Sequence, residues 1–106
     1  MKRIDILNEA INCVTGSREQ DYGSPEDNFN IIADFWSTYK GVSFSSVDVA
    51  MMMALLKIAR ICNDGGSGDS FVDLAGYAAC GGEIATSKNL QIKINSTPEN
   101  LQVKTN

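Results

Sequence analysis

The sequence contains no histidine, and this absence excludes several kinds of site before any motif is considered. Catalytic triads with an imidazole base, and zinc sites built on histidine, need a residue that the chain lacks. Cysteine is also scarce, and Cys13, Cys62 and Cys80 form no CxxC pair. Their odd number and apolar neighbours favour buried, reduced thiols over a disulfide framework.

Positive charge is in short supply. Nine Lys and Arg residues against thirteen Asp and Glu residues give a net charge of −4, whereas binding to duplex nucleic acid requires clustered cations. The longest apolar run, residues 49–56, is too short to span a membrane, and the first nine residues carry acids where a signal peptide has an apolar run. We therefore expect a cytoplasmic protein that binds neither duplex nucleic acid nor a membrane.

Helical periodicity accounts for most of the chain, whose 106 residues suit one domain. Apolar residues recur at spacings of three and four in four segments, and clear signals mark their ends. Ser24 is a good N-cap before Pro25, and Ser45 with Asp48 fits a capping box. The expected helices cover approximately residues 3–14, 25–40, 46–63 and 67–85. They predict a mainly α domain, residues 1–86, resembling a four-helix bundle.

The third and fourth expected helices differ in character. Apolar residues surround most of the helix at 46–63, which is typical of a central helix. The helix at 67–85 is rich in small residues that let another helix approach closely, either inside the fold or between subunits: Ala75, Gly76, Ala78, Ala79, Gly81 and Gly82.

The last twenty residues, 87–106, have a different pattern. Segments 89–95 and 100–106 are near-copies that alternate apolar and polar residues, and the turn-like residues 96–99 join them. We predict a short C-terminal β-hairpin, with a loosely ordered extended tail as the alternative. A lone hairpin is marginal in water, so it should dock on the helices or pair with another chain. Together with the small-residue helix, this predicts a homo-oligomer.

The first candidate site is the polar connection between the first two expected helices. It gathers cationic, acidic, aromatic and amide side chains, of which Arg18, Asp21, Tyr22 and Asn28 are expected to shape a pocket. Loops held by rigid helices often carry binding residues, and a helix N-terminus offers free N–H groups. The alternative is a well-capped surface turn in which Arg18 pairs with Asp21.

The second candidate site joins the last two helices. Lys57 and Arg60 share one face of a helix, and Asp69 and Asp73 share one face of the next, with Tyr77 one turn beyond. The aspartates could hold Mg²⁺ and the cations could clamp phosphates. The alternative is an interhelical salt-bridge network without a ligand.

The expected turn near Gly66 sets which of these residues meet. In an antiparallel hairpin about that turn, Arg60 lies level with Asp73, and Lys57 lies one turn further from the loop. Asp48 lies roughly 16 Å further along the axis, at 1.5 Å per residue. It is therefore better explained as part of a helix cap, and it could join the site only across a subunit interface.

These same residues resemble a family of small phage and prophage proteins of unknown function. The resemblance covers about residues 3–85 and depends on four runs: Asp21-Tyr22-Gly23-x-Pro25-Glu26-Asp27-Asn28-Phe29, Asp48-Val49-Ala50, Lys57-Ile58-Ala59-Arg60, and Asp69-Ser70-x-x-Asp73-Leu74-Ala75-Gly76-Tyr77-Ala78-Ala79. Their order is also similar to that of a nucleotide-modification-associated domain. More distantly, it resembles the MazG-like all-α nucleoside triphosphate pyrophosphohydrolases.

The resemblance implies a helical, usually oligomeric fold that handles nucleotides with Mg²⁺. MazG-like enzymes hold the metal on an ExxE motif of one helix and an ExxD motif of the next. Here Asp69 and Asp73 would correspond to the second motif, whereas the helix at 46–63 carries no ExxE.

Three functions follow as hypotheses. The first is a phage-type nucleotide-binding protein, active in the host cytoplasm, with Mg²⁺-dependent pyrophosphohydrolase activity. The second is a non-catalytic protein that sequesters a nucleotide second messenger and so counters a host defence. The third is a structural or interaction module whose charged residues form only salt bridges.

Overall fold

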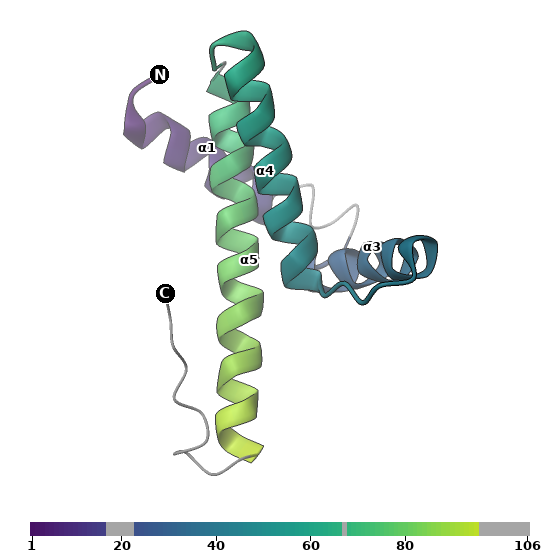
Figure 1. Cartoon of the computed structure of the whole chain (residues 1–106). Coiled ribbons are helices and arrows are strands. Elements are labelled where there is room, and N and C mark those ends of the chain that lie inside the picture. The colour runs from purple at the N-terminus through teal and green to yellow at the C-terminus, as the bar shows by residue number, and fades with distance from the viewer. Residues whose placement is uncertain (17–22, 67, 96–106) are drawn as a thin grey trace.

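A computed structural model of the protein describes residues 1–16, 23–66 and 68–95. Four helices occupy this part of the chain: α1 (Arg3–Thr15), α3 (Pro25–Lys40), α4 (Ser46–Asp64) and α5 (Gly68–Asn95) (Figure 1). No strand occurs within the same ranges. The prediction of a mainly α protein is confirmed, and the bounds agree with those expected to within a residue or two, except at the end of α5.

The C-terminal end of α5 differs from the prediction. The helix continues to Asn95, past its expected end near Ala85 and across residues 89–95, where we expected the first strand of a hairpin. A helix that has already formed gains one hydrogen bond for each residue added, and Leu, Lys and Gln are good helix formers. These effects outweigh a short alternating pattern. The remainder of the expected hairpin, residues 96–106, lies outside the described residues and stays a prediction.

Local capping signals set the helix starts. The Ser24 hydroxyl accepts a hydrogen bond from the Asp27 N–H at 3.2 Å, with Pro25 as the first helical residue. At the start of α4, the Ser45 hydroxyl accepts from the Asp48 N–H at 3.1 Å. The Asp48 carboxylate in turn accepts from the Ser45 N–H at 2.8 Å. The predicted capping box is confirmed, and it accounts for Asp48.

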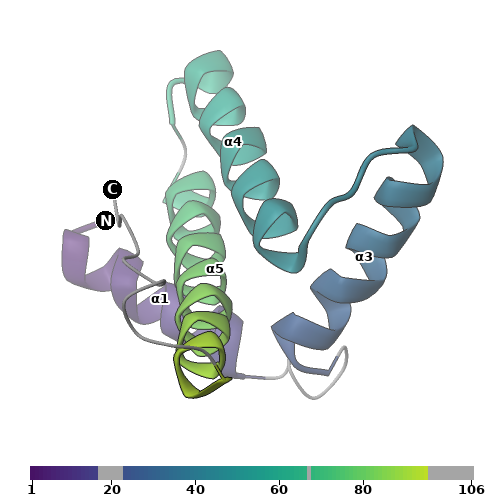
Figure 2. The same ribbon diagram turned by 60° about the horizontal axis from the view of Figure 1, so that its bottom comes forward.

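The helices surround α5 in an open arrangement. α4 packs antiparallel to the N-terminal part of α5. A tight turn joins the two helices, and Gly65 adopts the left-handed conformation there (φ 80°). α1 crosses α5 and packs mainly on it, while α3 contacts chiefly α4 and diverges from the other helices (Figure 2). The structure is therefore less compact than the bundle that we expected. None of the helices described is both long and apolar enough to cross a membrane.

The core lies where α3, α4 and α5 converge. Its buried side chains are Phe29 and Ala33 of α3, Val49 and Ala50 of α4, and Ile84 of α5. Trp36 and Phe44 border this core in an edge-to-face pair, with ring centroids 6.2 Å apart.

Two glycines of α5 allow its neighbours to approach closely. A Cβ atom at Gly81 would lie 2.9 Å from the Cβ of Ala50, and one at Gly76 would lie 3.3 Å from a methyl group of Val14. Gly81 thus lets α4 approach α5, and Gly76 lets α1 approach it. Of the two roles that we considered for the small residues, these two glycines fill the one inside the fold.

Adjacent glycines of α5 provide a matched test of this packing. We expect Gly81→Ala to destabilise the protein by about 1 kcal/mol. The cost of overpacking against the backbone-anchored Cβ of Ala50 exceeds the gain in helix propensity. Gly82 has no atom within 4 Å of the position of a Cβ, so Gly82→Ala should stabilise by roughly 0.5–1 kcal/mol. Urea denaturation of both variants measures the difference, and equal effects of the two would contradict the close approach.

Candidate functional site

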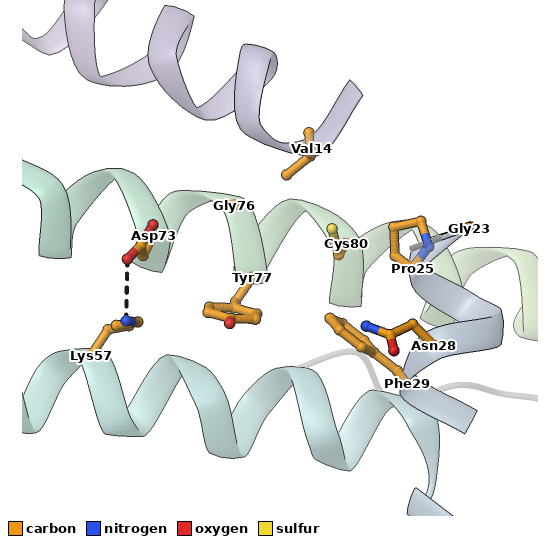
Figure 3. A pocket seen from close by; sticks show the side chains of 10 residues that line it. All are labelled: Val14, Gly23, Pro25, Asn28, Phe29, Lys57, Asp73, Gly76, Tyr77 and Cys80. Atoms are coloured by element: carbon orange, nitrogen blue, oxygen red, sulfur yellow. Dashed lines mark ion pairs between the residues drawn. The ribbon is translucent and has the colours of Figure 1, made fainter. Parts of the chain in front are cut away.

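A cavity of about 170 Å³ lies where all four helices come near each other. Its walls come from the end of α1, the start of α3, the inner side of α4 and the middle of α5 (Figure 3). It is lined by Val14, Gly23, Pro25, Asn28, Phe29, Lys57, Asp73, Gly76, Tyr77 and Cys80. It thus combines an ion pair, two aromatic rings and an amide in one concave site.

An ion pair forms one end of the cavity. The Lys57 Nζ atom lies 3.1 Å from the Oδ2 atom of Asp73, and the two side chains are 15% and 42% exposed. Lys57 occupies the core-facing stripe of α4, together with Ser46, Ala50 and Met53 at spacings of three and four. A cation on an inner helix stripe is costly unless it is paired. Asp73 supplies that pairing and leaves the lysine beside an open space.

Aromatic side chains form the middle of the cavity. The rings of Phe29 and Tyr77 are stacked, with centroids 6.1 Å apart and planes inclined by 30°. Phe29 is only 5% exposed and fixes the position of Tyr77, which is half-buried. Asn28, in the first turn of α3, lies beside them in Figure 3 and adds an amide, which both donates and accepts hydrogen bonds.

A second cavity, of about 180 Å³, borders the first. The two share Val14, Pro25 and Cys80 as lining residues, so they adjoin along α5. The second one differs in charge, because its acidic lining residues are Glu26 and Glu83. An elongated ligand that entered from the ion-pair end would therefore meet negative charge at the far end.

The structure brings together part of the predicted site. Lys57, Asp73, Tyr77 and Asn28 all line the cavity. Arg60 and Asp69 are exposed and do not line it.

The ion pair differs from the expected register by one helical turn. Lys57, and not Arg60, meets Asp73, because Lys57 lies on the stripe of α4 that faces α5. Arg60 lies three residues along, toward the exposed side of α4. Arg18, Asp21 and Tyr22 lie outside the described residues, so their place in the pocket stays a prediction.

Metal ligands are few in the described part of the protein. Within it, no three His, Cys, Asp or Glu side chains come close enough to hold an ion together. Asp69 and Asp73 lie one helical turn apart, and an oxygen of Asp73 already contacts the Lys57 ammonium group. Two carboxylates hold Mg²⁺ only with help from waters and substrate phosphates. The Mg²⁺ site stays a prediction.

Sequence reasoning missed several lining residues. It named Phe29 as the end of the run at residues 21–29, and it did not connect Phe29, Val14, Gly76 or Cys80 with the pocket. A signal for Cys80 was present, because Asp73, Tyr77 and Cys80 follow each other at i, i+4 and i+7 on one face of α5. The contribution of Val14 depends on the path of α1 across Gly76, which no local pattern encodes.

The fold and cavity thus define a small helical protein with a mixed ionic and aromatic site. The chain belongs to the family described as a domain of unknown function, DUF6378, whose model matches residues 5–85. The matched region contains all the lining residues of the first cavity.

Two curated relatives are phage proteins. The Gene 55 protein of Mycobacterium phage L5 is 49% identical over 76 residues, which cover 71% of this chain and 49% of the relative. The Gene 55 protein of Mycobacterium phage D29 is 47% identical over 75 residues, covering 71% and 50%. The chain spans about half the length of these relatives, and no solved structure matches it.

These matches confirm part of the expected family resemblance. They show that the chain belongs to a family of unknown function with relatives in phages. The more distant likeness to MazG-like pyrophosphohydrolases stays a prediction.

The ion pair can be tested by removing each partner separately. Lys57→Met replaces the cation by an apolar chain of similar length on a core-facing stripe, and it leaves Asp73 with access to water. We expect little change in the free energy of unfolding. Asp73→Asn removes the counter-charge of Lys57, which is the more buried of the two side chains. We expect it to lower the free energy of unfolding by about 1–2 kcal/mol. Urea denaturation measures both, and a larger loss for Lys57→Met would contradict this asymmetry.

Proposed function

We propose that the protein binds a nucleotide in the first cavity. The observation that carries the proposal is the convergence of a half-buried lysine, two aromatic rings and an amide on one concave surface. Each group suits one part of a nucleotide. The cation matches phosphate, the rings match the face of a base, and the amide matches the polar edge of a base.

The size of the cavity determines which part of the ligand it encloses. A volume of about 170 Å³ is below the roughly 300–1,000 Å³ of most pockets for whole ligands. It suits a base or nucleoside, with the remainder of the molecule lying outside. The nucleoside would rest against Tyr77 and Phe29, and the phosphates would extend toward Lys57.

The ion pair would respond to the ligand. A phosphate arriving beside Lys57 competes with Asp73 for the ammonium group, and the 42% exposed Asp73 side chain has room to turn toward water. The cation would thereby exchange a carboxylate for a phosphate without losing a charged partner. Arg60, one helical turn further along α4, is the next cation available to a longer phosphate chain.

Binding without turnover is the form of the proposal that this geometry supports best. It requires only Lys57, the aromatic pair and Asn28, all of which line the cavity. Mg²⁺-dependent hydrolysis would further require Asp69 and Asp73 to hold a metal together with the substrate. Sequestration of a nucleotide second messenger would use the same cavity and leave the ligand intact. The parts proposed for Arg18, Asp21 and Tyr22 derive from the sequence alone.

A comparison of nucleotides with nucleosides tests the proposal. The full chain is titrated calorimetrically with nucleoside triphosphates, cyclic nucleotides and matching nucleosides, with and without Mg²⁺, and the ligands are then analysed by chromatography. We expect Lys57→Met to weaken nucleotide binding by about tenfold or more, because a hydrogen bond to a charged group is lost. Nucleoside binding should stay nearly unchanged.

Two further variants make the result specific. Arg60→Met removes a cation outside the cavity and should change affinity much less than Lys57→Met. Tyr77→Ala should weaken nucleotides and nucleosides alike. A ligand that is intact after incubation supports sequestration. Hydrolysis is supported if a product forms only with Mg²⁺ and the Asp73→Asn variant no longer forms it. No binding of any nucleotide by the wild-type chain would overturn the proposal.

A further inference from the structure

α4 carries a largely exposed apolar surface. Five large side chains on it are 40–61% exposed: Met51 at 43%, Met52 at 40%, Leu55 at 61%, Leu56 at 46% and Ile58 at 43%. We call these five residues the outer face of α4. One of these side chains, Met51, also reaches α5, where its Cε atom lies 3.0 Å from the position of a Cβ at Gly81. Between Asp48 and Arg60, the only charged residue of the helix is Lys57, and Lys57 points inward to Asp73. The outer face is therefore free of charge along more than three turns.

α4 exposes larger apolar side chains than it buries. Its buried hydrophobic residues are Val49, Ala50 and Ala54, whereas two leucines, two methionines and an isoleucine lie on the outer face. Across the described residues, only eight hydrophobic side chains are buried, and four of these are alanines. So small a core gives modest stability.

We propose that the outer face of α4 binds the same face of a second copy of the chain. The two α4 helices would pack antiparallel about a twofold axis near Ala54 and Leu55. A single self-complementary patch suffices for such a dimer, because each subunit supplies the same surface. The most exposed residue of the face, Leu55, would lie at the centre of the interface.

The charges at the ends of the face favour antiparallel packing. Asp48 and Arg60 lie six residues on either side of Ala54, roughly 9 Å away along the axis in each direction. Antiparallel packing brings the end of α4 that carries Asp48 alongside the partner's end that carries Arg60, at both ends of the interface. Parallel packing would place like charges together, and it would also align the two helix dipoles unfavourably.

The apolar area fits a second copy. The five side chains expose on the order of 400 Å² together, close to the apolar share of one side of a standard interface of about 800 Å² per partner. A lipid surface fits less well, because on α4 itself Arg60 is the one cation beside the face and the chain carries a net charge of −4. The geometry therefore favours a protein partner with the same apolar face.

Measurement of mass in solution tests the dimer. The full chain is examined by size-exclusion chromatography with light scattering over a range of concentrations. We expect a mass of about 23 kDa, twice the 11.5 kDa of the monomer. Leu55→Glu places a charge at the centre of each side and should raise the dissociation constant at least 100-fold, with an unchanged far-ultraviolet circular dichroism spectrum. A wild-type chain that is monomeric throughout would overturn the proposal.

A matched substitution elsewhere identifies the interface. Phe35 of α3 is 72% exposed and also apolar, so Phe35→Glu introduces the same charge on another uncovered face. We expect Phe35→Glu to remain dimeric. Dissociation by Phe35→Glu but not by Leu55→Glu would assign the contact to α3 and contradict the proposal.

Charge reversal tests the orientation. Arg60→Asp should weaken the dimer several-fold, because it brings carboxylates together at both ends of an antiparallel interface. Asp48 is left unchanged, because its carboxylate caps the start of α4. If Arg60→Asp dimerises as tightly as the wild type, antiparallel packing of α4 is wrong.

Discussion

The contact between α4 and α5 at Ala50 and Gly81 determines most of what the molecule can do. Because position 81 carries no side chain, the two helices approach until the Cβ of Ala50 lies 2.9 Å from where another Cβ would stand. This spacing brings Lys57 within 3.1 Å of Asp73. Tyr77 of α5 stacks on Phe29 of α3, a helix that packs chiefly on α4, so the aromatic part of the cavity needs α3 in place as well.

α4 has two different faces. The inner stripe carries the small residues Ser46 and Ala50 near the start of α4, where Ala50 meets Gly81, and the longer Met53 and Lys57 further along. Several large apolar residues of α4, Leu55 and Leu56 among them, lie outside this stripe and are exposed. From its composition, α4 was expected to be surrounded by other helices of the chain. In the structure, one side of α4 lies against α5 and another side is uncovered. Apolar residues around most of α4 led us to predict a central helix. The same pattern is equally compatible with a helix that has one covered and one uncovered apolar side.

Local signals in the sequence predicted the helices well, because caps and breakers act within a few residues. The Ser45 and Asp48 capping box and the turn at Gly65 are examples. The end of α5 was predicted less well, since an alternating pattern does not reveal whether an existing helix will continue through it. The site was predicted in part. Lys57, Asp73, Tyr77 and Asn28 were found from residue type and spacing, but the exact pairing across α4 and α5 depends on helix rotation, which spacing alone does not fix.

The cavity belongs to no single helix, and this has a thermodynamic consequence. Val14 comes from α1, Asn28 from α3, Lys57 from α4 and Tyr77 from α5, so the complete binding surface exists only when all four are in place. A ligand held there adds its binding free energy to the native state as a whole. Occupancy would slow hydrogen exchange in all four helices, including α1, which packs mainly on α5 and carries an exposed apolar stripe of its own at Ile4, Leu7 and Ile11.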